Sequence, residues 1–114
     1  MAIVVTENAF TSKEQAVEEI KTANLWVLEL EFEDGDGNPH WHEFYDQVYV
    51  LEGTFSIRDD TTGIEYNCGA GTRIVVPPRT VHSELAAKAK TVIGISINPA
   101  TMGEDIDLSP ALLA

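Results

Sequence analysis

The feature that most constrains this chain is a change of hydrophobic period at residue 25. From Leu25 to Ile97, short apolar stretches are separated by turn sequences, with no helical pattern between them. Residues 28–33 show the pattern plainly, with leucine or phenylalanine at even positions and glutamate at odd positions. Consecutive strands with such short connections pair antiparallel. The sequence therefore predicts an all-β fold, either an antiparallel sandwich or a barrel.

Individual elements follow from the local signals. After residue 25, strands are predicted at 25–33, 47–51, 54–58, 64–66, 72–76, 81–86 and 91–97. Glu52-Gly53 is expected to be the turn of a hairpin between the second and third of these strands. Before them, residues 3–5 are expected to form an edge strand, and one helix is predicted over Thr11–Ala23. A capping box is available to that helix from Thr11 with Glu14 or from Ser12 with Gln15.

Length and pattern predict one domain. A chain of 114 residues is large enough to bury one core. The barrel is expected over about residues 25–98, preceded by the strand and helix of residues 1–24. Residues 99–114 lack strand periodicity, and we expect this tail to wrap the surface or a partner subunit.

The charge of the chain excludes several kinds of partner. Its formal net charge is −12, and it has only seven Lys and Arg residues. Nucleic acid and anionic membrane surfaces both require clustered basic residues, so neither is expected to bind. No apolar run approaches the length of a membrane span. The single cysteine, Cys68, cannot form an internal disulfide, which favours a reducing compartment and a cytoplasmic location.

Three histidines carry the chemical signal. His40 and His42 are two residues apart, so on a strand their side chains point to the same face. Asp46 follows closely, and His82 lies further along the chain. Three imidazoles and a carboxylate form a ligand set that suits a divalent transition metal. The competing interpretation places two histidines on a surface strand and one in the core, and we favour the metal site.

Two motifs around these histidines resemble those of the cupins. The first is Gly35-(x4)-His40-Trp41-His42-(x3)-Asp46-(x6)-Gly53, similar to the cupin pattern Gly-x5-His-x-His-x3–4-Glu-x6-Gly. The second is Gly71-(x5)-Pro77-Pro78-Arg79-(x2)-His82-(x3)-Ala86, similar to Gly-x5-Pro-x-Gly-x2-His-x3-Asn. The resemblance spans about Leu25 to Ile97 and implies a double-stranded β-helix, or jelly-roll, barrel that is often dimeric. It also implies a metal site, which in known members holds iron, manganese, nickel, zinc or copper.

This sequence departs from the cupin pattern at the fourth ligand. Asp46 stands where the family has Glu, and its side chain is one methylene shorter. Gln47 is the alternative ligand through its amide oxygen, but that would require a local bulge. In the second motif Arg79 replaces a glycine, where a positive φ would strain any other residue, and Ala86 replaces an asparagine. The metal identity, among Fe, Mn, Ni and Zn, is left open.

Further residues are candidates for work beside the metal. Glu84 shares a strand face with His82 and is a candidate general base or hydrogen-bond partner of a ligand; Tyr49 is a second candidate for moving protons. Arg73 would orient a substrate carboxylate. Tyr45 and Phe55 are expected to line the cavity. Trp41 has the opposite parity to the histidines and is expected to pack outward, against the helix or a partner subunit, which with the tail predicts a homodimer.

Three functions remain in competition. The first is a metal-dependent enzyme, a dioxygenase or an isomerase, acting on a small polar or carboxylated molecule. The second is a barrel that binds a metal or small ligand without turnover. The third is a structural barrel with an empty, degenerate site. The resemblance to cupins does not choose among them, since one fold carries many reactions.

Overall fold

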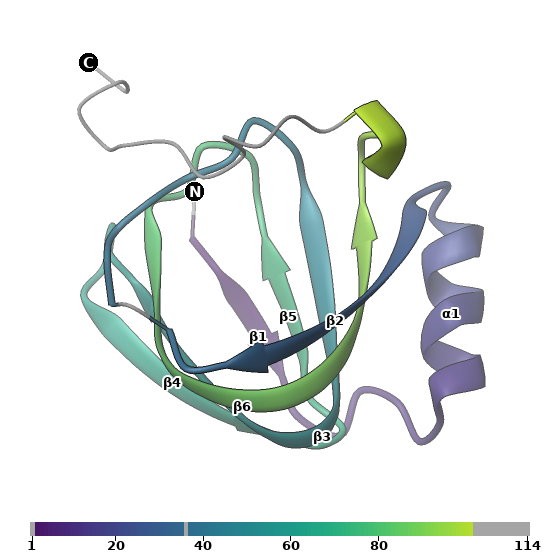
Figure 1. Cartoon of the computed structure of the whole chain (residues 1–114), viewed down its shortest axis with the longest axis horizontal. Coiled ribbons are helices and arrows are strands. Elements are labelled where there is room, and N and C mark those ends of the chain that lie inside the picture. Colours follow the sequence, from purple (N-terminus) through teal and green to yellow (C-terminus); the bar gives the residue numbers. More distant parts are fainter. Residues whose placement is uncertain (1, 36, 102–114) are drawn as a thin grey trace.

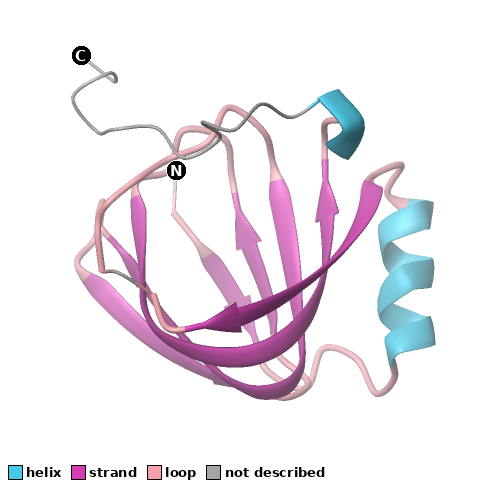
Figure 2. Cartoon of the chain, viewed as in Figure 1, coloured by secondary structure: helices cyan, strands magenta, loops and turns pink. Residues whose placement is uncertain are grey.

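The computed structural model describes residues 2–35 and 37–101, and it confirms the all-β prediction. Its elements are β1 (Val4–Thr6), α1 (Lys13–Thr22), β2 (Trp26–Glu33), β3 (Asp46–Asp59), β4 (Ile64–Gly69), β5 (Arg73–Val76), β6 (His82–Ile95) and the 3₁₀ turn η1 (Pro99–Thr101). All strand pairings are antiparallel, in the order β1-β5-β3-β6-β2, and β4 also pairs with β3. The sheet is strongly curved around the interior, with α1 outside it (Figures 1 and 2).

The prediction of a hairpin turn at Glu52-Gly53 was wrong. The chain runs through these residues as the single strand β3, which pairs along its length with β6, itself one strand where two were predicted. Leu51 is an extra residue in the pairing, because Val50 lies opposite Thr91 and Glu52 lies opposite Lys90. Gly53 has a φ of 85°, and a Cβ at this position would overlap the carbonyl oxygen of Lys88. The glycine therefore serves close strand packing beside a bulge, not a reversal of direction.

This bulge decides which β3 side chains face the interior. Before it, the even positions Val48 and Val50 belong to the main hydrophobic core, and after it Phe55 and Ile57 do. One extra residue shifts the alternation by one position, so the inward face passes from even to odd numbers. Tyr49, on the other face, packs in a second cluster with α1.

Helix α1 begins where one of the two predicted caps placed it. Ser12 is the N-cap, and its Oγ accepts a hydrogen bond of 3.1 Å from the Gln15 backbone amide. The Gln15 side chain in turn accepts one from the Thr11 amide. Ala16 and Ile20 are fully buried against the outer face of the sheet. In the parts of the chain that are described, no helix is long and apolar enough to cross a membrane.

Trp41 is buried within the chain itself. Only 4% of its surface is exposed, although it alternates with the two histidines. It therefore offers no surface to a partner subunit, and one of the two reasons for expecting a dimer is removed. The other, the tail, lies largely outside the described residues, since only positions 99–101 of it are described.

Candidate metal centre

Backbone hydrogen bonds hold the two histidine segments together. His40 and His82 exchange both of their backbone N–H···O bonds, each 2.9 Å long. The Arg79 amide donates a third bond, 2.8 Å, to the carbonyl oxygen of His42. Arg79 keeps the positive φ of the glycine it replaces, at 61°. The turn thus survives the substitution, and the Arg79 side chain pairs with Glu43 on the surface.

Gly35, the first residue of the first motif, lies very close to the backbone of Glu84. A Cβ on Gly35 would overlap the backbone carbonyl oxygen of Glu84. Two residues later, the Gly37 amide donates a 3.0 Å hydrogen bond to the same oxygen. The loop before His40 therefore crosses directly over the strand that carries His82 and Glu84, and a side chain at Gly35 would hold the two apart.

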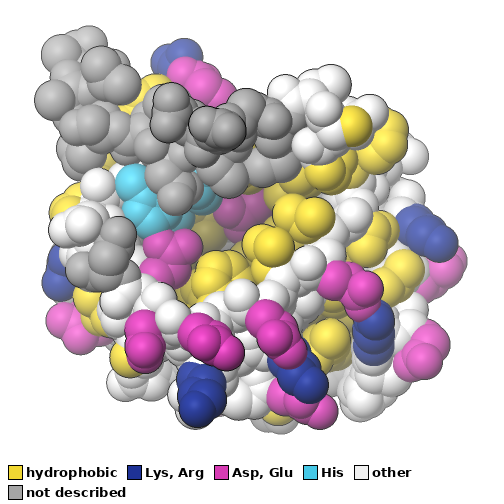
Figure 3. All heavy atoms as spheres, viewed as in Figure 1, with side chains coloured by type: hydrophobic (Ala, Val, Ile, Leu, Met, Phe, Trp, Pro, Cys, Tyr) yellow, Lys and Arg dark blue, Asp and Glu magenta, His cyan; other side chains and the backbone are white. Residues whose placement is uncertain are grey.

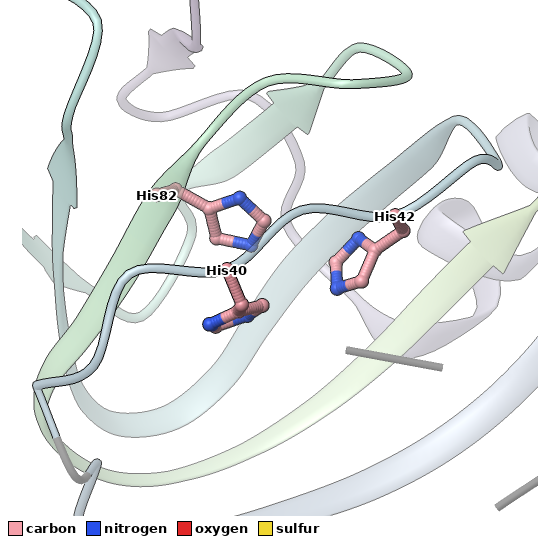
Figure 4. A group of neighbouring side chains, drawn as sticks. All are labelled: His40, His42 and His82. Atoms are coloured by element: carbon pink, nitrogen blue, oxygen red, sulfur yellow. The ribbon is translucent and has the colours of Figure 1, made fainter. Parts of the chain in front are cut away.

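The three imidazoles point toward one another, as Figure 4 shows. Each offers one possible ligand atom, and these atoms all lie within 4.8 Å of one another. Their ring centroids are 4.4 to 5.3 Å apart, and all three side chains are buried. Among the described residues these three histidines form a group that could hold a metal ion.

Two of the rings are fixed by backbone carbonyls. Nδ1 of His40 lies 3.1 Å from the Asn38 oxygen, and Nδ1 of His82 lies 2.8 Å from the Thr80 oxygen. A carbonyl only accepts, so in a neutral ring Nδ1 carries the proton and Nε2 is the nitrogen that can act as a ligand. Burial, with the neighbouring His42 and His40, lowers the pKa of His82 to about 4, despite the opposing bond to Thr80. This ring is therefore neutral at pH 7, the state that binds metals.

Two carboxylates lie beside the histidines. Oε2 of Glu84 is 3.1 Å from Nε2 of His40, and Oδ2 of Asp46 is 3.5 Å from Nδ1 of His42. Asp46 is 7% exposed. Gln47, the alternative ligand, turns away: its side chain bonds the hydroxyls of Tyr45 and Tyr49 on the outer face of β3. That alternative is wrong because no bulge falls between Asp46 and Gln47 to change the parity.

A cavity of about 160 Å³ adjoins the centre. Figure 3 shows the histidines in a hollow bordered by acidic and hydrophobic side chains. Its polar lining among the described residues is His42, Asp46, His82 and Glu84. The remainder is apolar and comprises Leu28, Leu30, Phe32, Phe44, Val48, Phe55, Ile57, Val76, Ile93 and Ile95. Phe55 thus lies where the sequence placed it.

Three other predicted site residues lie elsewhere. The Tyr49 hydroxyl donates to Glu19 of helix α1 at 3.0 Å, and Arg73 bonds the same carboxylate at 3.1 Å. Tyr45 joins this network through Gln47. Burial raises the pKa of Tyr49 above its ordinary value, and Glu19 adds to the rise. None of the three belongs to the described lining of the cavity. Tyr45 and Tyr49 alternate with the inward-facing Asp46 and Val48.

Phe44 is a site residue that the sequence interpretation missed. Its ring stacks on His42 with centroids 4.7 Å apart and planes 10° apart. It also lines the cavity. The signal was present, since Phe44 shares the even parity of His42 and Asp46.

Comparison with known proteins gives the fold. No protein-family model and no curated protein sequence matches the chain. The solved structure of KdgF from Halomonas sp. is similar, with a TM-score of 0.54 and 23% identity over 68% of this chain and 74% of its own. A DUF861 family protein from Thermotoga maritima has a TM-score of 0.51 and 11% identity over 84% of this chain and 99% of its own. Both are cupin-fold proteins. The chain has the cupin fold.

A third cupin-fold structure is similar over more of this chain. The polyketide cyclase RemF from Streptomyces resistomycificus has a TM-score of 0.50 and 20% identity over 91% of this chain, which spans 64% of RemF. The cupin fold is the fold that the resemblance of the two motifs implied. It also agrees with the jelly-roll class predicted for the barrel.

The residues present in this cupin-fold chain fit a divalent metal. Three buried imidazoles, two with Nδ1 tied to a carbonyl, point toward a common centre with carboxylates beside them. Transition metals prefer such nitrogen and oxygen ligands. The three histidines could therefore hold a metal ion.

Proposed function

We propose that this cupin domain binds a divalent transition metal through His40, His42 and His82 and acts as a metal-dependent enzyme on a small molecule. The observation that carries the proposal is the buried three-histidine cluster, of which His42 and His82 line a largely apolar cavity. A metal held there with free coordination positions polarises a bound oxygen or acidifies a bound water. The similarity to a polyketide cyclase agrees with a small-molecule substrate.

The side chains of the site have separate tasks. Asn38 and Thr80 fix the orientation of two rings through their carbonyl oxygens, so that the lone pairs are aimed before any ligand arrives. Phe44 restrains His42 by stacking on it. Of the two carboxylates at the site, one can complete the ligand set and the other can orient a ring or hold a proton.

The cavity argues for a substrate different from the polar or carboxylated molecule that the sequence suggested. The described lining has no Lys or Arg, and Arg73 is engaged with Glu19 on the helix side. The two carboxylates offset the charge of a divalent ion, so the site would hold no net positive charge for an anionic substrate. We therefore propose a small, neutral and largely apolar molecule that presents an oxygen donor to the metal. A cavity of about 160 Å³ is well below the size that drug-like ligands fill.

Oxygenation is the reaction to test first, with isomerisation second. A face of three histidines suits Fe(II), whereas Mn, Ni and Zn compete for the same ligands. Oxygen uptake by Fe(II)-loaded protein should be measured with small diketones and phenols, and with carboxylic acids of equal size as the matched comparison. We expect consumption of a neutral compound and none of its acid counterpart. Exclusive use of the acids would contradict the proposed substrate class.

A binding protein without turnover is the second candidate. It gains support from the position of Tyr49, which removes one of the two groups expected to move protons. If no compound is consumed but the neutral ones raise the melting temperature of the metal-loaded protein, this second function is favoured.

We also propose that the protein forms a homodimer. The edge strand β2 supports this, because Trp26 and Leu30 are 49% and 39% exposed on it. Static light scattering at micromolar concentration should give twice the mass of one chain. A monomer would refute the proposal.

A further inference from the structure

We propose that the carboxylate ligand of this metal site is Glu84, and that Asp46 orients His42 from outside the ligand set. The inference rests on the proposed metal site and assigns its fourth protein ligand. It moves the carboxylate from the first histidine motif, where cupins carry it, to the strand of the second.

The backbone places Glu84 firmly at the site. It lies two residues beyond His82 on β6, and both side chains line the same cavity. Its carbonyl oxygen accepts a hydrogen bond from Gly37, and Gly35 packs against it without a side chain. The loop that carries His40 is therefore packed against the backbone of Glu84, and this brings the Glu84 side chain within reach of the His40 ring.

The contact between Glu84 and His40 calls for a positive charge. Nδ1 of His40 faces the Asn38 carbonyl and carries the ring proton, which leaves a lone pair on Nε2. Oε2 of an ionised Glu84 is 3.1 Å from this nitrogen and also has only lone pairs to offer. Two acceptors repel each other at this distance unless a cation or a second proton is shared between them. Ligand atoms of His42 and His82 lie within 4.8 Å of that of His40, which favours a metal ion over a second proton.

The distance itself suits two ligands of one ion. Ligand nitrogens and oxygens lie about 2.0–2.2 Å from a metal such as zinc, so two at a right angle are about 3 Å apart. The 3.1 Å between Glu84 and His40 matches that edge.

Asp46 is positioned for a different task. Its Oδ2 is 3.5 Å from Nδ1 of His42. Nδ1 is the nitrogen that faces a carbonyl acceptor in His40 and in His82. Asp46 thus faces Nδ1 of the His42 ring in the way that backbone carbonyls face Nδ1 of His40 and His82. Its short side chain suits that place, since a glutamate would reach further toward the ion.

Cobalt(II) binding to the untagged full chain tests the assignment. The d–d absorption spectrum reports which atoms ligate cobalt, and titration gives the dissociation constant. Glu84→Ala should change the spectrum, and the isosteric Glu84→Gln should weaken binding more than Asp46→Asn does. Asp46→Asn should keep the wild-type spectrum and weaken binding about 10-fold, as loss of a ring-orienting group does. Glu65→Gln, exposed on β4, is the matched control and should behave as wild type.

Each result decides the question. A spectrum changed by Asp46→Asn, whether or not Glu84→Ala also changes it, overturns the role given to Asp46. A wild-type spectrum in Glu84→Ala overturns the role given to Glu84. If the wild-type chain binds no cobalt, the proposed metal site itself fails. Circular dichroism of the metal-free variants verifies that they are folded.

Discussion

The metal-free protein should lose stability as the pH falls through the range in which an exposed histidine titrates. In the unfolded chain His82 has its ordinary pKa of 6.5, whereas in the folded chain burial lowers the pKa to about 4. Between these values the unfolded chain binds more protons, so the stability contribution is fully present above pH 6.5 and is lost on acidification. A shift of this size corresponds to about 3 kcal/mol, a large part of the stability of a small domain.

Urea unfolding of EDTA-treated protein from about pH 7.5 to about pH 4 measures this loss. The control is His82→Gln, which keeps the polarity and removes the titration. Carboxylates titrate in both proteins, so the pH dependence of the wild type should exceed that of the variant by about 3 kcal/mol over this range. Equal pH dependence in the two proteins would refute the conclusion that His82 is held neutral by burial.

Three further outcomes follow from the fold. Gly53→Ala should cost about 2 kcal/mol more than Gly63→Ala in urea unfolding, because both have positive φ but only the first would overlap the Lys88 carbonyl; equal costs would contradict the close packing. Asp59→Asn should destabilise the chain at pH 7 by about 1–3 kcal/mol. Burial alone would raise the pKa of Asp59, but the hydrogen bonds to its carboxylate outweigh burial and lower the pKa below 3.8. The stability lost in Asp59→Asn should therefore shrink as the pH falls below 3.8. A loss that stays constant with pH would contradict the role given to these hydrogen bonds. Tyr49→Phe should retain wild-type cobalt affinity while losing about 1 kcal/mol of stability. Weakened cobalt binding would contradict the position of Tyr49 outside the metal site.

The fold could be predicted because its signals are local. Alternating residues in β2 place Leu28 and Phe32 inward and the glutamates outward, as found. The grouping of the three histidines could be predicted from their spacing and from the resemblance to cupins. The extent of β3 and β6 could not be predicted, because Glu52-Gly53 is a hairpin signal and only its strand partner reveals that the glycine relieves a close contact.

The lining of the site was predictable only in part. Tyr49 could have been excluded by parity, since it is an odd number of residues from Asp46 with no bulge between them. Phe55 could not have been assigned in that way, because the bulge at Leu51 reverses the parity before it is reached. The approach of Glu84 to His40 depends on the backbone bonds between two segments far apart in sequence, and no local pattern encodes them.

The measurement that tests the central claim most directly is the metal content of untagged protein reconstituted with Fe(II) without oxygen. Wild type should retain about one equivalent after gel filtration, and His82→Ala should retain almost none, because two imidazoles leave the ligand set incomplete. Less than about a tenth of an equivalent in the wild type, or equal retention by the variant, would contradict a metal centre built on His40, His42 and His82.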